Sequence, residues 1–185
     1  MDRFEYLSVL VSIVIALGMS EVVSGWGRLL RQRADVRFSL LHASWSLFSL
    51  ALMAQFWWGF WNYRVIEDWT FGALLLVLAI PFSIVLAAQV ITPSEGVVRG
   101  LDLREYFLGN RRLFFGTAAS LLLLLGLADG AVAKQPVLHV ENAIRLAGLA
   151  IVALAAKSAN LQLHLAIVAL AFVLLTAFVA WEFWA

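Results

Sequence analysis

Long apolar runs dominate this sequence and limit the folds open to it. Four stretches, at residues 6–27, 38–62, 70–92 and 161–183, are each long enough to cross the roughly 30 Å hydrocarbon core of a bilayer as a helix. The chain is 63% hydrophobic and 14% charged, whereas a soluble domain carries about 25% charged residues. A globule of 185 residues cannot bury so much apolar surface. The sequence therefore predicts an all-α integral membrane protein whose main partner is the lipid bilayer.

Two further runs carry a weaker signal. Residues 113–131 include five consecutive leucines, and residues 137–156 are purely apolar only in their second half. We count both as spans, because omitting the second would place the basic loops on opposite sides of the membrane. The prediction is a single transmembrane domain over residues 1–185, built as a bundle of six transmembrane helices. The polar segment 94–112, in which leucines and aromatic residues alternate with charges, predicts a short interfacial helix before the fourth span.

The basic residues indicate an orientation. Nine of the thirteen Lys and Arg residues fall in loops on one side of the predicted bundle: Arg28, Arg31, Arg33, Arg37, Arg99, Arg104, Arg111, Arg112 and Lys157. By the positive-inside rule this side is cytoplasmic, so both termini are predicted to lie outside. The acidic residues before the first apolar run, and the lack of a small-residue cleavage pattern, favour a retained span over a signal peptide. The short basic loops are explained by topology and do not indicate nucleic-acid binding.

Several ionisable or polar residues are predicted in the cytoplasmic third of the membrane. In the first span Gly18, Glu21, Gly25 and Arg28 share one helical face, and their small residues permit close helix packing. A charged carboxylate facing lipid is costly, so Glu21 either bonds to Arg28 or binds a proton or cation. Ser39, His42, Ser46, Ser49 and Met53 form an inward stripe on the second span. We expect four side chains to converge at this depth: Glu21, His42, Gln89 and His164.

The metal and cofactor chemistry of this group stays open. Two histidines and a carboxylate could bind a transition metal, and two histidines could hold a haem iron. Neither pattern has paired spacing on one helix, so we assign no metal ligand and no cofactor. The chain has no cysteine, which excludes disulfides and thiolate sites. Pro81, in the middle of the third span, frees the carbonyl of Val77 and predicts either a static kink, closed by Ser83 or another helix, or a hinge.

A second polar group is predicted at the outer side. It comprises Asp129, His139, Glu141 and Arg145. Glu141 and Arg145 are four residues apart, in the favourable order for a helical ion pair. Arg145 therefore either pairs with Glu141 or Asp129, or grips an anionic group through its planar guanidinium. A faint internal repeat, IALGMSEVVSG against LLLGLADGAVA, aligns Glu21 with Asp129 and would divide the chain into two halves of opposite topology.

The stretch AQFWWGFWNYR, residues 54–64, gathers aromatic rings at the predicted outer end. Six of the eight tryptophans belong to this end. Aromatic belts mark both membrane interfaces, so anchoring explains part of the cluster but not its one-sidedness. Trp57 and Trp61 continue the inward face of the second span. If these rings meet Arg145, a cation–π contact or an aromatic-walled outer pocket follows. Belt and pocket both remain open.

Three segments carry a resemblance: FEYLSVLVSIVIALGMSEVVSGWGRLLRQR, QFWWGF and DLREYFLGNRR. Together they resemble a group of short, multi-span bacterial inner-membrane proteins for which we know no activity, cofactor or catalytic residue. The resemblance implies a bacterial cytoplasmic membrane and nothing more.

Three functions are compatible with these features, and an enzyme is not favoured. The first is a small-solute or ion transporter or channel that uses Glu21 and Arg145 as binding or coupling groups. The second is a non-catalytic subunit or scaffold of a larger membrane complex, or a homo-oligomer. The third is a haem- or metal-dependent redox protein that uses His42 and His164. The sequence does not identify a substrate.

Overall fold

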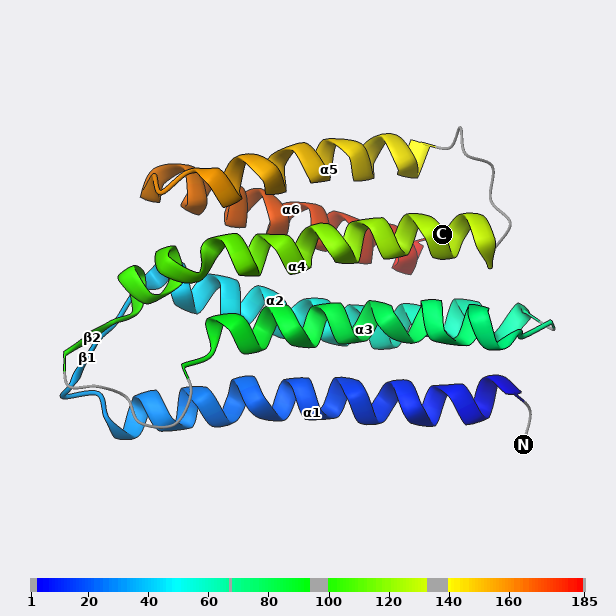
Figure 1. Cartoon of the computed structure of the whole chain (residues 1–185), viewed down its shortest axis with the longest axis horizontal. Helices are drawn as coiled ribbons and strands as arrows, with labels where there is room; N and C mark the ends of the chain where they lie inside the picture. The colour runs from blue at the N-terminus through cyan, green and yellow to red at the C-terminus, as the bar shows by residue number, and fades with distance from the viewer. Residues whose placement is uncertain (1–2, 67, 94–99, 133–139, 185) are drawn as a thin grey trace.

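The structure is a computed structural model that describes residues 3–66, 68–93, 100–132 and 140–184. About 87% of the described residues are helical. Six α-helices run back and forth along one long axis (Figure 1): α1 (Arg3–Arg31), α2 (Leu40–Gly59), α3 (Phe71–Ile91), α4 (Leu103–Ala131), α5 (Val140–Lys157) and α6 (Leu161–Trp184). A 3₁₀ helix, η1 (Phe60–Val65), continues α2. Two short parallel strands, β1 (Val36–Arg37) and β2 (Leu101–Asp102), pair at one end of the bundle.

The all-α prediction is confirmed, and each predicted span overlaps one of these helices. By length and hydropathy, α1, α3, α4 and α6 qualify as membrane-crossing helices among the described residues. The sequences of α2 and α5 show why these two are weaker candidates. Helix α2 contains three serines, a histidine and a glutamine, and α5 contains Glu141, Arg145 and Lys157. The fold is consistent with a membrane protein.

The predicted interfacial helix before the fourth span is wrong for the described part of segment 94–112. Residues 103–112 are the first part of α4, which continues without a break to Ala131. The Asp102 carboxylate accepts hydrogen bonds from the backbone N–H groups of Arg104 and Glu105, which starts the helix, and no proline interrupts it afterwards. Phe107 is fully buried against other helices, so this apolar face packs in the protein core.

The helices form successive layers. Helix α1 lies at one edge, α2 and α3 lie next to it, and α4 and α6 separate them from α5 at the far edge (Figure 1). Helix α3 packs against α1, α2 and α4. One apolar core, which includes Val22, Met53 and Ile80, joins α1, α2 and α3, and a second, which includes Trp45 and Phe115, joins α2, α4 and α6.

Two glycines allow α1 to approach its neighbours closely, as their shared face predicts. A Cβ atom at Gly18 would lie 2.5 Å from Val85 Cγ2 of α3, and one at Gly25 would lie 2.3 Å from Thr92 Cγ2. Real Cβ atoms do not approach other atoms so closely, so a larger residue at either position would push α1 away from α3.

Candidate functional sites at the two ends of the bundle

Glu21 forms an ion pair within its own helix, in agreement with the structural alternative. Arg28 Nη2 lies 2.9 Å from Glu21 Oε1 and donates a second hydrogen bond, of 3.2 Å, to the carbonyl of Pro93. The Glu21 side chain is 40% exposed, twice the exposed fraction of Arg28. Arg28 therefore links α1 to the segment that follows α3.

The end of α3 explains why Arg28 and other side chains gather here. Pro93 disfavours helical geometry at Thr92, whose backbone is extended, so α3 ends at Ile91. The last carbonyls of a helix have no partner within the helix. Three side chains from other helices reach this region; we call them the carbonyl clamp (Arg28, His42 and Tyr106).

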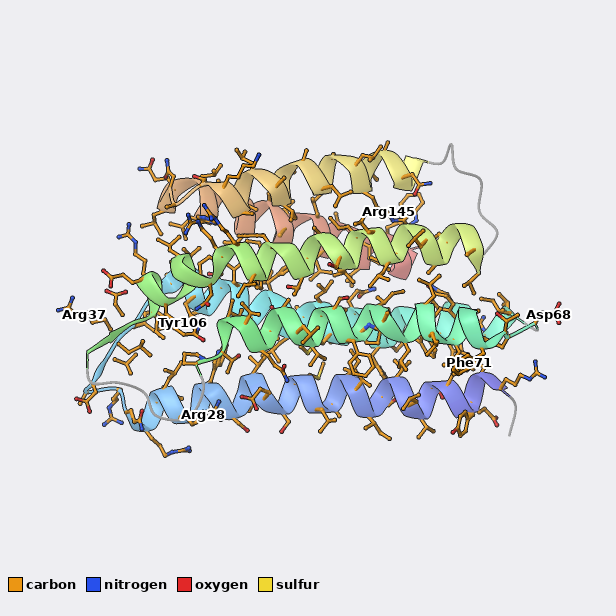
Figure 2. All side chains as sticks on the ribbon, viewed as in Figure 1. Arg28, Arg37, Asp68, Phe71, Tyr106 and Arg145 are labelled. Carbon is orange, nitrogen blue, oxygen red and sulfur yellow. The ribbon has the colours of Figure 1, made fainter. Side chains whose placement is uncertain are left out.

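Each member of the carbonyl clamp bonds to the backbone at the end of α3. His42 Nε2 donates to the carbonyl of Ile91 at 2.7 Å, and Tyr106 Oη lies 3.4 Å from each of the carbonyls of Val90 and Thr92. Because a carbonyl only accepts hydrogen bonds, the proton of His42 must be on Nε2. Arg28 and Tyr106 approach from opposite sides of α3 (Figure 2). The clamp thus ties α1, α2 and α4 to one helix terminus.

The expected convergence of Glu21, His42, Gln89 and His164 is not found. Gln89 is exposed. His164 is fully buried, but its Nε2 donates to the carbonyl of Ser158 at 2.9 Å, and its ring stacks on Phe115. Within the described residues, no three His, Asp or Glu side chains are grouped as a metal site requires. The inward stripe on α2 is confirmed, since Ser39, His42, Ser46, Ser49 and Met53 are all buried.

At the opposite end of the bundle, Arg145 pairs with Asp129. Arg145 Nη2 bonds to Asp129 Oδ2, and Nη1 donates to Asn142 Oδ1 at 2.7 Å. The side chains of Arg145 and Asp129 are 17% and 18% exposed, so the pair is largely shielded from its surroundings and joins α5 to α4. The side chain of Glu141 and the whole of His139 lie outside the described residues, so the predicted Glu141–Arg145 pair stays a prediction.

Tyr63 of η1 lies within electrostatic reach of this pair. Burial raises the pKa of the Tyr63 phenol to about 12; the Asp129 carboxylate adds to this effect and the Arg145 guanidinium opposes it. The 3₁₀ helix is therefore a neighbour of the ion pair between α4 and α5.

The aromatic stretch divides into rings that pack within the protein and rings that are exposed. Phe60 is buried and stacks on Phe4 and Tyr63, with ring centroids 5.3 and 5.5 Å apart. Trp57 and Trp61 are more than half exposed. The guanidinium of Arg64 lies 5.0 Å from the Trp61 ring centroid, so Trp61 has a cation–π partner other than Arg145.

A cavity of about 370 Å³ does lie at this end of the bundle, but neither Trp57 nor Trp61 lines it. It opens between the first turns of α1 and α3, and its lining residues are Arg3, Tyr6, Leu7, Trp69, Thr70, Phe71 and Leu74. Its volume falls within the roughly 300–1,000 Å³ typical of ligand pockets. Arg3 donates to the carbonyl of Trp69 at 3.2 Å and so bridges the two helix starts.

Pro81 is buried inside a continuous α3. The hydroxyl of Ser83 donates to the carbonyl of Ala79 at 3.0 Å, so it does not serve the Val77 carbonyl as expected. The alternative of a hinge at Pro81 stays a prediction.

Comparison of the chain with protein-family models, curated proteins and solved structures finds no match. The structure itself defines an all-helical chain with four helices that are long and apolar enough to cross a membrane.

Sequence reasoning missed Tyr106, Asn142 and Tyr63 as neighbours of the candidate sites. Pro93 was the available signal for the first, because a proline after an apolar run marks a helix end whose carbonyls need donors. The sequence contains no comparable signal for Tyr63, which comes near the Arg145–Asp129 pair only through the packing of η1.

Proposed function

We propose that this chain is a six-span protein of a bacterial cytoplasmic membrane that transports or conducts a small solute or ion. Six crossings require α2 and α5 to span with the four more apolar helices. Helix α2 has 20 residues and α5 has 18, which gives lengths of about 27–30 Å at 1.5 Å per residue. Both helices also run along the same axis as the other four (Figure 1). The bacterial location rests on the sequence resemblance alone.

The distribution of charge supports an orientation with both termini outside. Eight described basic residues lie toward the end of the bundle where α1 ends: Arg28, Arg31, Arg33, Arg37, Arg104, Arg111, Arg112 and Lys157. Three lie toward the other end: Arg3, Arg64 and Arg145. The positive-inside rule makes the first end cytoplasmic.

Cysteine labelling tests this topology, because the wild-type chain has no cysteine. Arg37 and Asp68 lie at opposite ends of the bundle (Figure 2) and are both exposed. In intact spheroplasts, a membrane-impermeant maleimide should label Asp68→Cys, but should label Arg37→Cys and Lys157→Cys only after lysis. Labelling of Arg37→Cys from outside would rule out this orientation or the crossing of α2, and labelling of Lys157→Cys would rule out the crossing of α5.

One observation carries the transport proposal: an ion pair lies toward each end of the bundle. Arg28–Glu21 lies toward the cytoplasmic end, and Arg145–Asp129 lies toward the outer end. Each arginine also holds a second group, Pro93 or Asn142. Intramembrane charges that face protein commonly mark solute or ion pathways. Release of the Arg28 contacts would free α1 from the segment after α3 while the Arg145–Asp129 pair still joined α5 to α4. Such independent movement at the two ends is what alternating access requires.

Proton flux into liposomes tests the proposed role of Glu21. Purified protein is reconstituted in liposomes that contain a pH-sensitive dye, and a pH gradient is imposed with potassium and valinomycin present. We expect wild type to dissipate the gradient faster than protein-free liposomes and Glu21→Gln to lose most of this excess rate. Glu105→Gln, which removes an exposed carboxylate near the start of α4, is the matched control and should equal wild type. A wild-type rate equal to that of protein-free liposomes, or a Glu21→Gln rate equal to wild type, would reject proton coupling at Glu21.

A second candidate, a subunit of a larger membrane complex, is favoured by the exposure of α6. Only 11% of the apolar span of this helix is buried within the chain. Its exposed side chains include Val173, Leu174, Phe178 and Trp181. Native mass spectrometry of protein extracted in mild detergent distinguishes the candidates: a stoichiometric partner or a fixed copy number supports a subunit, and a lone chain with lipid supports the transporter.

Of the three candidate functions, the redox protein has the least support from the geometry. His42 and His164 each use Nε2 to bond a backbone carbonyl, of Ile91 and Ser158 respectively. The two histidines bond to different backbone segments, and the described residues contain no group of three His, Asp or Glu side chains that could hold a metal, so we do not propose a haem or metal site.

A further inference from the structure

A second cavity, of about 220 Å³, lies at the end of the bundle that we assign to the cytoplasm. Its walls come from the last turns of α1, from β1, and from the first turns of α2 and α4. The residues that line it are Trp26, Leu29, Leu30, Arg33, Val36, Phe38, His42, Ala43 and Leu103. It is distinct from both ion pairs.

The lining combines an apolar slot with one cation. Seven of the nine lining residues are apolar, and His42 already commits Nε2 to the carbonyl of Ile91. Arg33 is the charged residue of the lining and is itself exposed, just after the end of α1. A site with this composition suits an amphiphile that has an apolar chain and an anionic head.

The size and position of the cavity further restrict the class of ligand that it could bind. The cavity is smaller than the roughly 300–1,000 Å³ of pockets that enclose whole drug-sized ligands. It therefore fits part of an acyl chain and not an entire amphiphile. In the orientation that we propose, Trp26 and Phe38 lie near the cytoplasmic ends of α1 and α2, where aromatic residues commonly meet lipid headgroups.

Charge complementarity favours an anionic head. Among the described residues within two positions of the lining along the chain, the exposed arginines are Arg31, Arg33, Arg37 and Arg104, whereas Arg28 is already paired with Glu21. The acidic side chains there are Asp35 and Glu105, which are exposed, and Asp102, which caps α4. Basic pockets between helices on the cytoplasmic side are suited to anionic lipid headgroups.

We propose that this cavity binds an anionic phospholipid of the cytoplasmic leaflet, with part of one acyl chain in the slot beside Trp26 and Leu103 and the headgroup phosphate against Arg33. The lipid would fill the space between the first turns of α2 and α4 and the end of α1. This binding does not depend on transport, so either proposal can fail without the other.

Native mass spectrometry of delipidated protein in a non-ionic detergent tests the proposal. Three probes separate the contributions of head and chain: phosphatidylglycerol, phosphatidylcholine with the same chains, and glycerol 3-phosphate, which has no chain. We expect one phosphatidylglycerol per chain to bind at the lowest concentration, phosphatidylcholine to bind at least fivefold more weakly, and glycerol 3-phosphate to show no binding at the same concentrations. Equal binding of the two lipids would overturn the role of Arg33, and equal binding of glycerol 3-phosphate would overturn the role of the slot.

Matched variants locate the site. Arg33→Gln should weaken phosphatidylglycerol binding roughly fivefold, as expected for the loss of one arginine near a lipid phosphate. Arg112→Gln removes an exposed arginine of α4 outside the cavity and should change binding less than twofold. Ala43→Leu fills the slot and should weaken both lipids, whereas Ala54→Leu, at an exposed position of the same helix, should not.

Arg33→Gln alters an exposed side chain and leaves core packing intact, so it remains informative even if Ala43→Leu fails to fold. Equal losses in Arg33→Gln and Arg112→Gln would show that binding follows surface charge in general, and would refute this site.

Discussion

The close approach of α1 to α3 makes Gly18 sensitive to substitution. In Gly18→Ala the new Cβ would lie 2.5 Å from Val85 Cγ2 and 3.1 Å from Met53 Cε. Carbon atoms in contact sit about 3.5–4.0 Å apart, so the two helices must separate by about 1 Å or the side chains must move. Met53 is flexible, but the branched side chain of Val85 has little rotational freedom.

The expected change in the free energy of unfolding follows from two opposing contributions. Overpacking a core costs about 1–3 kcal/mol, and the stiffness of Val85 places the cost in the upper half of that range. Replacing Gly by Ala in a helix contributes about 1 kcal/mol in the other direction. We therefore expect Gly18→Ala to lower the free energy of unfolding by about 1–2 kcal/mol.

Gly116→Ala is the matched control, because a Cβ at Gly116 of α4 would meet nothing within 4 Å. It should raise stability by about 0.5–1 kcal/mol. Both variants are compared by equilibrium unfolding in mixed detergent–SDS micelles, followed by circular dichroism. In a Val85→Ala background, which removes the clashing methyl group, Gly18→Ala should lower the free energy of unfolding much less than it does in wild type. If Gly18→Ala is as stable as Gly116→Ala, or if Val85→Ala brings no relief, the inferred α1–α3 packing is incorrect.

Two further predictions concern the end of the bundle at which Arg145 and Asp129 lie. Arg145→Met leaves the shielded Asp129 carboxylate without its cation and should cost about 3–5 kcal/mol of stability, whereas the double variant Asp129→Asn/Arg145→Met should recover most of that loss. A loss in Arg145→Met that the double variant does not recover would show that the pair itself is not what stabilises this end. The pKa of the Tyr63 phenol should be about 12 rather than 10.0. Because the fold favours the neutral phenol, the free energy of unfolding should not change below pH 10 and should fall as the pH rises from 10 to 12. NMR of ¹³C-labelled tyrosine measures this pKa in a protein whose other two tyrosines are replaced by Phe. In that background Asp129→Asn should lower the pKa of Tyr63. A pKa of 10 without the Asp129 substitution would contradict the burial of Tyr63.

Features that lie within one helix were predictable from the sequence. The helical character and approximate range of each span follow from runs of apolar residues of sufficient length. The Glu21–Arg28 pair and the small-residue face with Gly18 and Gly25 also follow, because helix geometry alone places residues seven apart on the same side. The polar residues of α2 revealed its inward stripe for the same reason.

Features that depend on two helices were not predictable in this way. Gln89 was expected beside His42 and is exposed, while Tyr106, which the sequence did not single out, contacts the end of α3. The prediction of a separate interfacial helix was wrong because its apolar residues, Phe107 among them, pack against other helices. In each case the outcome depends on how a helix is rotated about its axis.

The sequence by itself determined that this chain forms apolar helices and how charge is distributed between their two ends, since length, hydropathy and loop charge are local properties. Only the tertiary structure decided that Arg145 pairs with Asp129 and that three side chains hold the end of α3. The physical reason is that helices such as α3 and α6 are apolar on nearly every side, so their sequences contain no polar face to indicate which side is turned inward. Packing of rings and glycines against neighbouring helices sets that rotation, and with it the partners of each polar group.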